Sequence, residues 1–457
     1  MIGKAVLVIG AGRTGEACAE VLSTRGIEVY VTDEQPPAKL ERALAAIRSS
    51  GGRFVAPDQL GAILSKIDRA ILSPGVPVAG ALARKVASAV PLVGEIEVAY
   101  ELCEAPIIAV TGTKGKSTTT ALIAHVLRCA GKSARVGGNI GNPLIREAAA
   151  AKRNEWVVAE VSSFQLETIK TFKPHISVLL NVSDDHLDRY ASLEEYTRAK
   201  YRIFEHQDAR DIFIGNLDDR LVHAAHSQIQ AQTFWFSVNG SNAQAVAFVD
   251  RNAVWYRPPD GRPRKVIERS DIALPGDHNL ENVLAAVLAA TSAGATLINL
   301  AESIPSFEPM DHRLQMIAEV AGVRYVDDSK ATNPAAVMAA LQSFDAPIVL
   351  IAGGKSKGAD LTQLAATIRE RVKSLIAIGE SGAAIARASA QTPSVQAATL
   401  EDAVQRAREQ AVSGDIVLLS PGFASFDMFT SAEERGERFD EVVREIERSA
   451  LQETAGA

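Results

Sequence analysis

The chain has 457 residues, of which 47% are hydrophobic and 23% are charged. Its 55 acidic and 48 basic residues give a formal net charge of -7, which argues against non-specific nucleic-acid binding, because such binding needs a basic surface. The length exceeds that of one ordinary hydrophobic core and predicts about three domains.

The three cysteines, Cys18, Cys103 and Cys129, are far apart and form no C-x-x-C pair. Reduced thiols are therefore expected, rather than disulfides or a zinc site. No apolar run reaches the roughly 20 residues that span a bilayer. The opening MIGKAVLVIG has no cleavable leader pattern. These features predict a cytoplasmic protein with no membrane partner.

The first block of the chain alternates apolar strands with helical segments, which predicts a parallel sheet covered by helices. The expected elements are strands at Ala5–Gly10, Glu28–Thr32 and Arg69–Ser73 and a helix near Pro37–Ser50. Residues Gly10 to Gly15 read GAGRTG, and the acidic Asp33 follows the second strand. This G-x-G-x-x-G pattern is the fingerprint of a dinucleotide-binding βαβ unit, in which backbone N–H groups bind a diphosphate. We call Gly10–Gly15 the first phosphate loop; taken alone, it indicates a dehydrogenase.

A second phosphate loop, Thr111–Thr118, reads TGTKGKST and lies between an apolar strand and a helix. Its glycines let successive N–H groups face an anion, Lys116 can reach terminal phosphates, and Ser117 can hold Mg²⁺. Val110 stands five residues before Gly115, so the loop is a shortened relative of the usual G-x-x-x-x-G-K pattern. A dehydrogenase has no use for this loop, whereas an enzyme that spends ATP on a nucleotide-bearing substrate uses both loops.

The alternation continues through two further blocks, with natural cuts near Glu104 and Phe307. The second block contains a β-rich insertion with the turn signals Asn239-Gly240 and Asp260-Gly261. The last residues, Leu451–Ala457, are expected to fray. The remaining predicted elements are strands at Ile107–Val110, Trp156–Val161, Ile176–Asn181, Val323–Val326, Ile348–Ala352, Leu375–Ile378 and Ile416–Leu419, the insertion at Thr233–Tyr256 and a helix at Asn279–Ala293.

Three residues after the second phosphate loop are candidates for magnesium and phosphoryl-transfer chemistry. Glu160 ends an apolar strand, where open α/β sheets bind ligands, although a strand-end carboxylate can also simply face solvent. His186, in NVSDDHLDRY, is by its spacing either a ligand or a surface histidine. Lys200 lies on a helical segment and, from its position alone, is expected to be solvated.

Several motifs occur together and in order, and with them the chain resembles the Mur ligase family of ATP-dependent amide-forming enzymes. The motifs are TGTKGKST, GGNIGNP, EVSSFQLE, NVSDDHLDRY, RAKYRIF, LPGDHNLENVLAA, DHRLQ, DDSKATNP, GGKSKGAD and LSPGFASFDMF. The resemblance implies an α/β fold with three domains, each with a mostly parallel sheet flanked by helices. These are a Rossmann-like UDP-sugar domain at 1–104, a central P-loop-type ATPase domain at 105–308 and a mobile, Rossmann-like amino-acid-binding domain at 309–457.

The resemblance also implies a reaction: D-glutamate is joined to UDP-N-acetylmuramoyl-L-alanine through an acyl phosphate, in peptidoglycan precursor synthesis. The segment Asp328–Asn333 matches the family member with this activity. ATP and two Mg²⁺ ions are implied, with Lys200 modified to a carbamate that shares a magnesium with His186. The protein is expected to act as a monomer, with no nucleic-acid partner.

The resemblance assigns roles to residues that match the family's motifs. Implied catalytic residues are Lys116, Glu160, His186 and Lys200, and implied metal ligands are Ser117, Glu160, His186 and carbamylated Lys200. The implied ATP site comprises Gly112, Thr113, Lys114, Gly115, Lys116, Ser117, Thr118, Asn282, Arg313 and Asp328. The implied UDP-substrate site comprises Gly12, Arg13, Thr14, Gly15, Asp33, Ser73, Asn139, Ser162 and Gln165. The implied D-glutamate site comprises Lys330, Thr332, Lys357, Ser425 and Phe426.

Some positions depart from the family pattern. They are Lys114 in the second phosphate loop, Glu34 and Gln35 after Asp33, Lys355 beside the predicted D-glutamate site, and Ala432 in place of a phenylalanine. Three alternatives stay open from the sequence: a nicotinamide-dependent oxidoreductase, an ATPase module without ligase activity, and a related ligase that adds a different amino acid, such as glutamate chains on folate.

Overall fold

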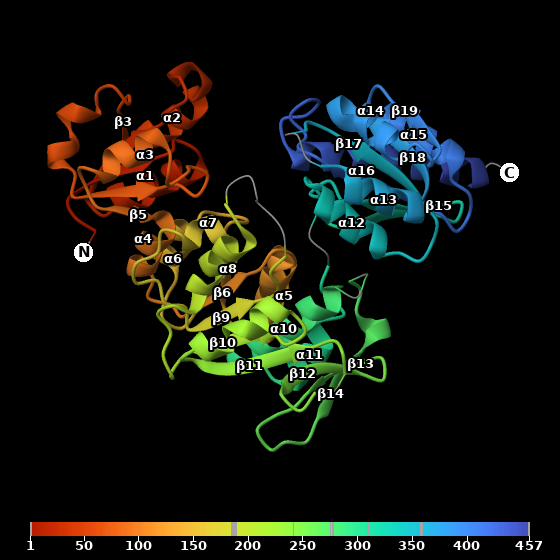
Figure 1. The fold of residues 1–457 in the computed structure, drawn as a ribbon, viewed down its shortest axis with the longest axis horizontal. Helices are drawn as coiled ribbons and strands as arrows, with labels where there is room; N and C mark the ends of the chain where they lie inside the picture. Colours follow the sequence, from red (N-terminus) through yellow and green to blue (C-terminus); the bar gives the residue numbers. More distant parts are fainter. Residues whose placement is uncertain are drawn as a thin grey trace. The chain divides into compact units, whose positions relative to one another are not determined.

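Three β-sheets, of five, nine and six strands, organise the described part of the chain (Figure 1). This computed structural model describes residues 2–183, 190–240, 242–274, 276, 278–308, 311–356 and 360–455. The chain divides into two compact units, Met1–Ile272 with His278–Phe307, and Ala273–Asp277 with Glu308–Ala457. The first unit holds the five- and nine-stranded sheets, and the second holds the six-stranded sheet.

The first sheet has five parallel strands in the order β3-β2-β1-β4-β5. Every residue of the central strand β1 is buried, as expected when helices cover both faces of a parallel sheet. The elements are β1 (Ala5–Ile9), α1 (Arg13–Ser23), β2 (Glu28–Thr32), α2 (Glu41–Ser49), β3 (Arg53–Phe54), β4 (Arg69–Leu72), α3 (Ala81–Ala87), β5 (Leu92–Gly94) and α4 (Glu95–Leu102).

The second sheet has nine described strands in the order β14-β13-β12-β11-β10-β9-β6-β8-β7, and among these strands only the β12–β13 and β13–β14 pairs are antiparallel. Its elements are β6 (Ile107–Thr111), α5 (Lys116–Cys129), β7 (Ala134–Gly138), α6 (Leu144–Ala150), β8 (Trp156–Glu160), α7 (Ser163–Leu166), β9 (Ile176–Leu179), α8 (Leu193–Tyr201), β10 (Ile212–Asn216), α9 (Arg220–Ala224), β11 (Gln232–Ser237), β12 (Ala245–Asp250), β13 (Ala253–Tyr256), β14 (Arg264–Glu268), α10 (His278–Ser292) and α11 (Leu297–Ser303). The predicted β-rich insertion, Thr233–Tyr256, contains most of the parallel strand β11 together with β12 and β13, and the antiparallel end of the sheet is completed by β14.

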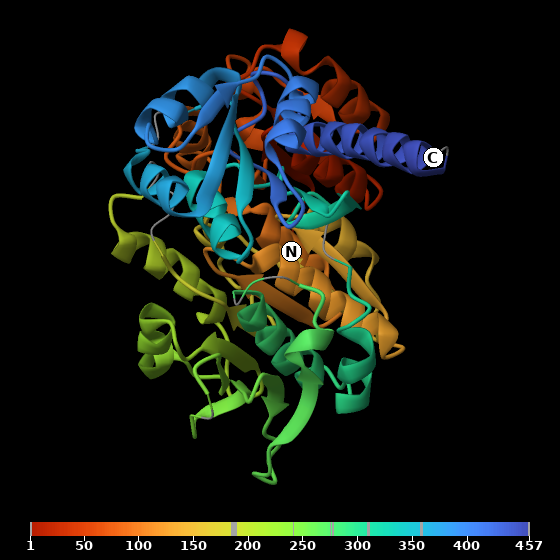
Figure 2. The same cartoon turned by 90° about the vertical axis from the view of Figure 1, so that its right-hand side faces the viewer.

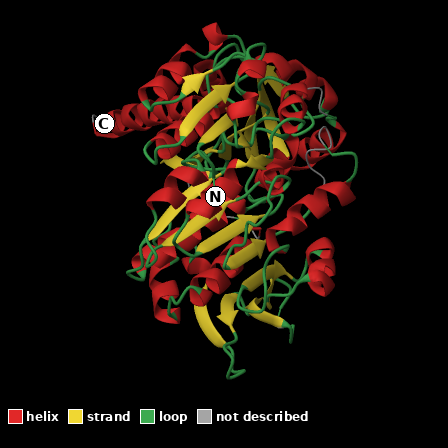
Figure 3. Cartoon of the chain, turned by 90° about the vertical axis from the view of Figure 1, so that its left-hand side faces the viewer, coloured by secondary structure: helices red, strands yellow, loops and turns green. Residues whose placement is uncertain are grey.

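The third sheet has the order β15-β16-β20-β17-β18-β19, with β15–β16 as its antiparallel pair. Its elements are β15 (Gln315–Val320), β16 (Val323–Asp327), α12 (Pro334–Gln342), β17 (Ile348–Gly353), α13 (Thr362–Arg371), β18 (Val372–Ile378), α14 (Gly379–Ala388), β19 (Ser394–Gln396), α15 (Leu400–Gln410), β20 (Ile416–Gly422) and α16 (Ala432–Ala455). Figure 2 shows the long helix α16 running out to the C-terminus, and Figure 3 shows the strands of each unit lying between helices.

These sheets confirm the predicted α/β class with three mostly parallel, helix-flanked sheets. The helix expected near Pro37–Ser50 is present as a 3-10 turn at Pro37–Lys39 followed by α2. The expectation that the chain is frayed from Leu451 was wrong for the described residues, since α16 continues to Ala455 through residues that favour a helix.

The predicted domain boundaries stay predictions. The cut between 1–104 and 105–308 lies within the first compact unit, and the assignment of a ligand to each domain stays a prediction. None of the helices within the described ranges has the length and apolar character that crossing a bilayer requires.

Helix α4 joins the first two sheets through two buried carboxylates. Glu95 accepts a hydrogen bond from the Ile145 N–H at the start of α6 (2.6 Å). Glu97 accepts from the backbone N–H groups of residues 170–172, at 2.8, 2.6 and 3.1 Å, and from the Thr171 hydroxyl. Because ionised acceptors make hydrogen bonds roughly twice as strong as neutral ones, Glu97 fixes α4 firmly against the second sheet.

We predict that Glu97→Ala lowers the stability of the chain by about 3 kcal/mol, because three backbone N–H groups and the Thr171 hydroxyl lose an acceptor that is itself buried. The midpoint of thermal unfolding, followed by circular dichroism, would measure the loss. The control is Glu104→Ala, whose exposed ion pair with Arg153 has side chains 63% and 85% accessible. Such a pair contributes about 0–1 kcal/mol, so equal effects of the two variants would contradict the proposed role of Glu97.

Candidate active site

The first phosphate loop connects β1 to α1 by a turn that its three glycines make possible. Gly10 has φ +108°, a left-handed value that favours glycine. A Cβ added at Gly15 would overlap the Gly10 carbonyl oxygen, so the helix packs closely against the turn. Gly12, the residue before α1, has no side-chain cap hydrogen bond within the described part of the chain. No capping side chain there competes with a ligand for the N–H groups of the first helical turn, as an anion site requires.

Two predicted substrate residues hold this loop in place. Asp33 accepts hydrogen bonds from the N–H groups of Ala11 and Gln35, both at 2.8 Å. Ser73 donates to the Gly10 carbonyl at 3.3 Å. Arg13 lies exposed in the first turn of α1 and donates to the Gly141 carbonyl, which belongs to the second sheet's part of the unit. Asp33 thus anchors the loop backbone in this structure, in addition to its expected place near the uridine.

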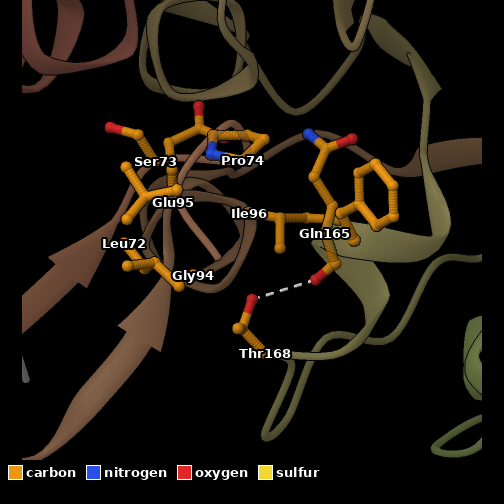
Figure 4. A pocket seen from close by; sticks show the side chains of 10 residues that line it. Leu72, Ser73, Pro74, Gly94, Glu95, Ile96, Gln165 and Thr168 are labelled. Carbon is orange, nitrogen blue, oxygen red and sulfur yellow. Dashed lines mark hydrogen bonds between the residues drawn. The ribbon is translucent and has the colours of Figure 1, made fainter. Parts of the chain in front are cut away.

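A small pocket lies where the first sheet meets α7 (Figure 4). It brings together two residues predicted for the sugar nucleotide, Ser73 and Gln165. Ser162 caps the N-terminus of α7, since its hydroxyl accepts from the Gln165 N–H and the Gln165 side chain accepts from the Ser162 N–H. Glu95 also lines the pocket, and burial raises the pKa of its carboxyl to about 7. The lining residues are Leu72, Ser73, Pro74, Val76, Gly94, Glu95, Ile96, Phe164, Gln165 and Thr168.

The second phosphate loop connects β6 to α5, and Gly115 (φ +82°) precedes the first residue of the helix. The N–H groups of Thr113 and Lys114 both donate to the Asn181 side-chain oxygen, at 3.0 and 2.8 Å. The Lys116 ammonium lies over the loop and donates to the carbonyls of Gly112 (3.1 Å) and Thr113 (3.0 Å). Its charge is therefore already at the loop where a phosphate would bind.

Helix α10 supports the same loop from its first turns. The Asn282 side-chain oxygen accepts from the Thr119 hydroxyl at 3.1 Å, and its amide donates to Asn279 at 2.8 Å. A Cβ added at Gly115 would overlap that same Asn282 oxygen. Asn282, predicted at the ATP site, thus contacts the phosphate loop directly. Asn181, which sequence reasoning missed, follows strand β9, and an asparagine after a parallel strand is a signal that could have found it.

The carboxylate of Glu160 is suited to a cation. Glu160 ends β8 opposite Val110 of β6 and is 1% exposed. One oxygen accepts from the Asn139 amide (2.7 Å), whereas the other, Oε2, is buried and has no hydrogen-bond partner among the residues that the structure describes. Ser117 is buried in the first turn of α5. A buried carboxylate oxygen without a described partner and a buried hydroxyl of the second phosphate loop are ligands that Mg²⁺ accepts, so the chemistry of both residues fits a magnesium site.

Lys200 is buried, and the expectation of a solvated side chain was wrong. It is 1% exposed on α8 and donates to the Gly112 carbonyl at 2.7 Å. Its ammonium also lies 4.4 Å from the centre of the Tyr196 ring. The apolar side of α8 packs into the core, which a helix position alone does not reveal. His186 lies outside the described residues.

In the second unit, Asp328, Lys330 and Thr332 follow strand β16, whereas Ser425 and Phe426 follow strand β20. Asp328 is buried and accepts from the Ser420 hydroxyl at 2.8 Å; burial raises its pKa to about 7. Lys330 pairs with Glu433 of α16. Thr332 is exposed, and Ser425 is buried. Phe426 is 67% exposed, and Lys357 lies outside the described residues.

Family models match three consecutive parts of the chain. The Mur ligase MurD-like N-terminal domain matches residues 4–94, the Mur ligase middle domain matches residues 110–290, and the Mur ligase glutamate ligase domain matches residues 312–423.

Curated relatives are similar over nearly the whole chain. A Pelotomaculum thermopropionicum protein named UDP-N-acetylmuramoylalanine--D-glutamate ligase is 42% identical over 450 residues, which cover 97% of this chain and 98% of the relative. A protein of the same name from Koribacter versatilis is 40% identical, with the same coverage of both chains, 97% and 98%.

Solved structures share the fold at low identity. UDP-N-acetylmuramate-alanine ligase MurC of Thermotoga maritima is 20% identical with a TM-score of 0.61, covering 96% of this chain and 99% of that one. A pseudomurein peptide ligase type C of Methanothermus fervidus is 18% identical with a TM-score of 0.61, covering 97% and 100%. These likenesses confirm the three-sheet α/β architecture.

We predict that Gly115→Ala weakens ATP binding by about tenfold or more, because the new side chain would be strained and would displace Asn282 from the loop. Isothermal titration calorimetry with an ATP analogue would measure the change. The matched control is Gly131→Ala at the other end of α5, which has a similar φ of +74° but no neighbour within 4 Å of its Cβ position. Equal losses in both variants would show that backbone strain alone, and not the Asn282 contact, is responsible.

Proposed function

Because this chain belongs to the Mur ligase family, we propose that it joins D-glutamate to UDP-N-acetylmuramoyl-L-alanine in an ATP-dependent reaction. The observation that carries the proposal is the presence of two phosphate-type loops on two sheets of the same unit. An enzyme that uses one nucleotide as energy donor and another as substrate carrier needs both. The names of relatives about 40% identical over nearly the full length support the same reaction.

We propose that each predicted domain binds one of the three substrates. Domain 1–104 binds the UDP-sugar, with its diphosphate at the N–H groups of the first phosphate loop. Domain 105–308 binds ATP at the second loop, and domain 309–457 binds D-glutamate. Lys330, with the predicted Lys357, supplies cations for the two carboxylates of the amino acid. The ion pair of Lys330 with Glu433 then has to open when the amino acid binds.

Magnesium, when bound, neutralises negative charge on the phosphates of ATP. Glu160 and Ser117 are the described residues that would hold it, and the buried, unpartnered Oε2 of Glu160 supports this assignment. A second ion is proposed at His186 and Lys200. The ammonium of Lys200 cannot ligate a cation, so this role requires the carbamate, which converts the side chain into an oxygen ligand.

The proposed reaction has two steps. The carboxylate of the L-alanyl group attacks the γ-phosphorus of ATP, which forms an acyl phosphate and releases ADP. Lys116 and the loop N–H groups stabilise the charge on the transferred group. The amine of D-glutamate, positioned by His186, then attacks the acyl carbon, and phosphate leaves. Closure of the third domain excludes water, which would hydrolyse the acyl phosphate.

We further propose that the protein acts as a cytoplasmic monomer, since its nucleotide substrates are cytoplasmic. The rival oxidoreductase, suggested by the first phosphate loop alone, leaves Thr111–Thr118 and its Asn181 and Asn282 contacts without a role. A ligase for another amino acid shares all of these contacts, so only substrates distinguish it.

The decisive test is phosphate release from ATP with UDP-N-acetylmuramoyl-L-alanine and a panel of amino acids of both hands. We expect release and amide product with D-glutamate only. Lys116→Ala should lower the rate by more than about a hundredfold, because the transferred phosphoryl group loses its cation. Release that is independent of any amino acid would indicate an ATPase module, and preference for another amino acid would indicate a different ligase.

We predict that Lys200→Ala abolishes ligation and that a small added carboxylate, such as acetate, restores part of it. The added anion would occupy the place of the lost carbamate and supply its oxygen ligands. Activity is measured across an acetate series, with ATP binding and circular dichroism as controls for folding. Failure of the rescue in a folded, ATP-binding variant would rule out the carbamate.

A further inference from the structure

Arg313, assigned to ATP by the proposed function, lies between two residues with a left-handed backbone. His312 has φ +63° and Leu314 has φ +47°. Neither residue is a glycine, so both conformations are strained and persist only where surrounding contacts enforce them. The contacts around His312 and Leu314 therefore determine the backbone conformation on both sides of Arg313 and so its orientation.

The contacts come from a buried ion pair. The His312 Nδ1 atom lies 2.5 Å from Asp327 Oδ2, and both residues are buried. Asp327 also accepts from the Ser329 N–H at 2.7 Å. The His312 carbonyl accepts from the Lys330 N–H at 3.1 Å. The segment that carries Arg313 is thereby tied to the segment that carries Asp328 and Lys330.

Helix α16 covers this pair. A Cβ added at Gly436 would overlap the His312 ring, so the helix backbone packs directly on the imidazole. One turn later, Asp440 places an oxygen within 4.8 Å of the His312 and Asp327 ligand atoms. Its Oδ1 atom is buried with no hydrogen-bond partner among the described residues. A carboxyl group beside a carboxylate in this setting is favoured in its protonated form.

The surrounding charges agree with this assignment. Other charged groups interact electrostatically with His312, Asp327 or Asp440. They are Arg435 and Arg444 of α16, Asp311 of the His312 segment and the neighbouring Asp328. Burial raises the pKa of Asp440 to about 7, and the charge of Asp327 acts in the same direction. The hydrogen bond to Asp327 raises the pKa of His312.

We propose that Asp440 is a positioning residue which, in its protonated form, stabilises the Asp327–His312 pair and so holds Arg313 in its ATP-binding orientation. The inference rests on the proposed function only through the assignment of Arg313 to ATP. Deprotonation of Asp440 adds a second negative charge beside Asp327. This charge weakens the Asp327–His312 pair and so the contacts that orient Arg313.

The direction of the pH effect follows from linkage. The folded chain binds the Asp440 proton more tightly than the unfolded chain, whose aspartate has a pKa of 3.8. The stabilisation is therefore complete below about pH 4 and is lost as the pH rises to about 7. Asp440→Asn is a permanent mimic of the protonated form, so it should gain stability over the natural protein as the pH rises.

The test compares the full chain with Asp440→Asn and with Glu437→Gln, an exposed carboxylate on the same helix. The difference in melting temperature between Asp440→Asn and the natural chain should increase by about 3 °C from pH 5.5 to pH 8, and Glu437→Gln should show no such trend. Affinity for an ATP analogue, with no other substrate present, should fall severalfold over this range in the natural chain but not in Asp440→Asn.

A second variant keeps the test independent of changes at Asp440 itself. Arg444, whose charge lowers the pKa of Asp440, is exposed, so Arg444→Gln should move the fall in affinity to higher pH. Three results would each overturn the proposal. The first is a melting-temperature difference between Asp440→Asn and the natural chain that does not change with pH. The second is a pH profile of ATP-analogue affinity that is the same in Arg444→Gln as in the natural chain, and the third is retention of Zn²⁺ in equilibrium dialysis that depends on Asp440. Because binding and stability are measured without ligation, failure here is distinguishable from failure of the proposed function.

Discussion

The two carboxylates on α4 hold the first two sheets, and with them the two phosphate loops, in fixed positions relative to each other. The loops belong to different sheets, and their separation depends on how firmly those sheets are joined. Glu95 and Glu97 are two residues apart on one helix, so they point in different directions and reach α6 and the 170–172 segment separately. A helix held at two places cannot rotate about either one. The first unit therefore presents both loops on one framework, as expected if two nucleotides have to react with each other.

Both loops are suited to bind an anion in the same way, so neither loop alone identifies its ligand. A glycine turn exposes backbone N–H groups, and the following helix adds the positive end of its dipole. Nothing in that arrangement distinguishes a UDP diphosphate from that of a redox cofactor. The distinction comes from their combination on one chain, together with the side chains that support the second loop. Asn181 and Asn282 contact that loop and restrict its conformations, which reduces the ordering that ligand binding would otherwise require.

Much of the fold could be predicted from the sequence, because strands such as β1 and β8 are continuous apolar runs and the glycine loops are local signals. The site was harder to predict from the sequence where it depends on contacts between distant segments. The burial of Lys200 depends on the packing of α8 against the second loop, 88 residues earlier in the sequence. The role of Glu97 depends on a segment more than 70 residues away. Asp440 gives no signal at all in the sequence, since an aspartate on a polar helix is ordinary until its neighbours are known.

The single hydrogen bond from Asn139 to Glu160 has a consequence for ion selectivity. With one oxygen already accepting from the amide, the other oxygen, Oε2, is the one with most capacity left for a proposed cation. Calcium prefers six to eight oxygens and often takes both oxygens of a carboxylate, whereas magnesium keeps several of its own waters and needs few protein ligands. If Glu160 binds the proposed cation through Oε2 alone, this monodentate mode favours the smaller ion. Discrimination between the two alkaline-earth metals would then originate in an asparagine that need not touch either of them.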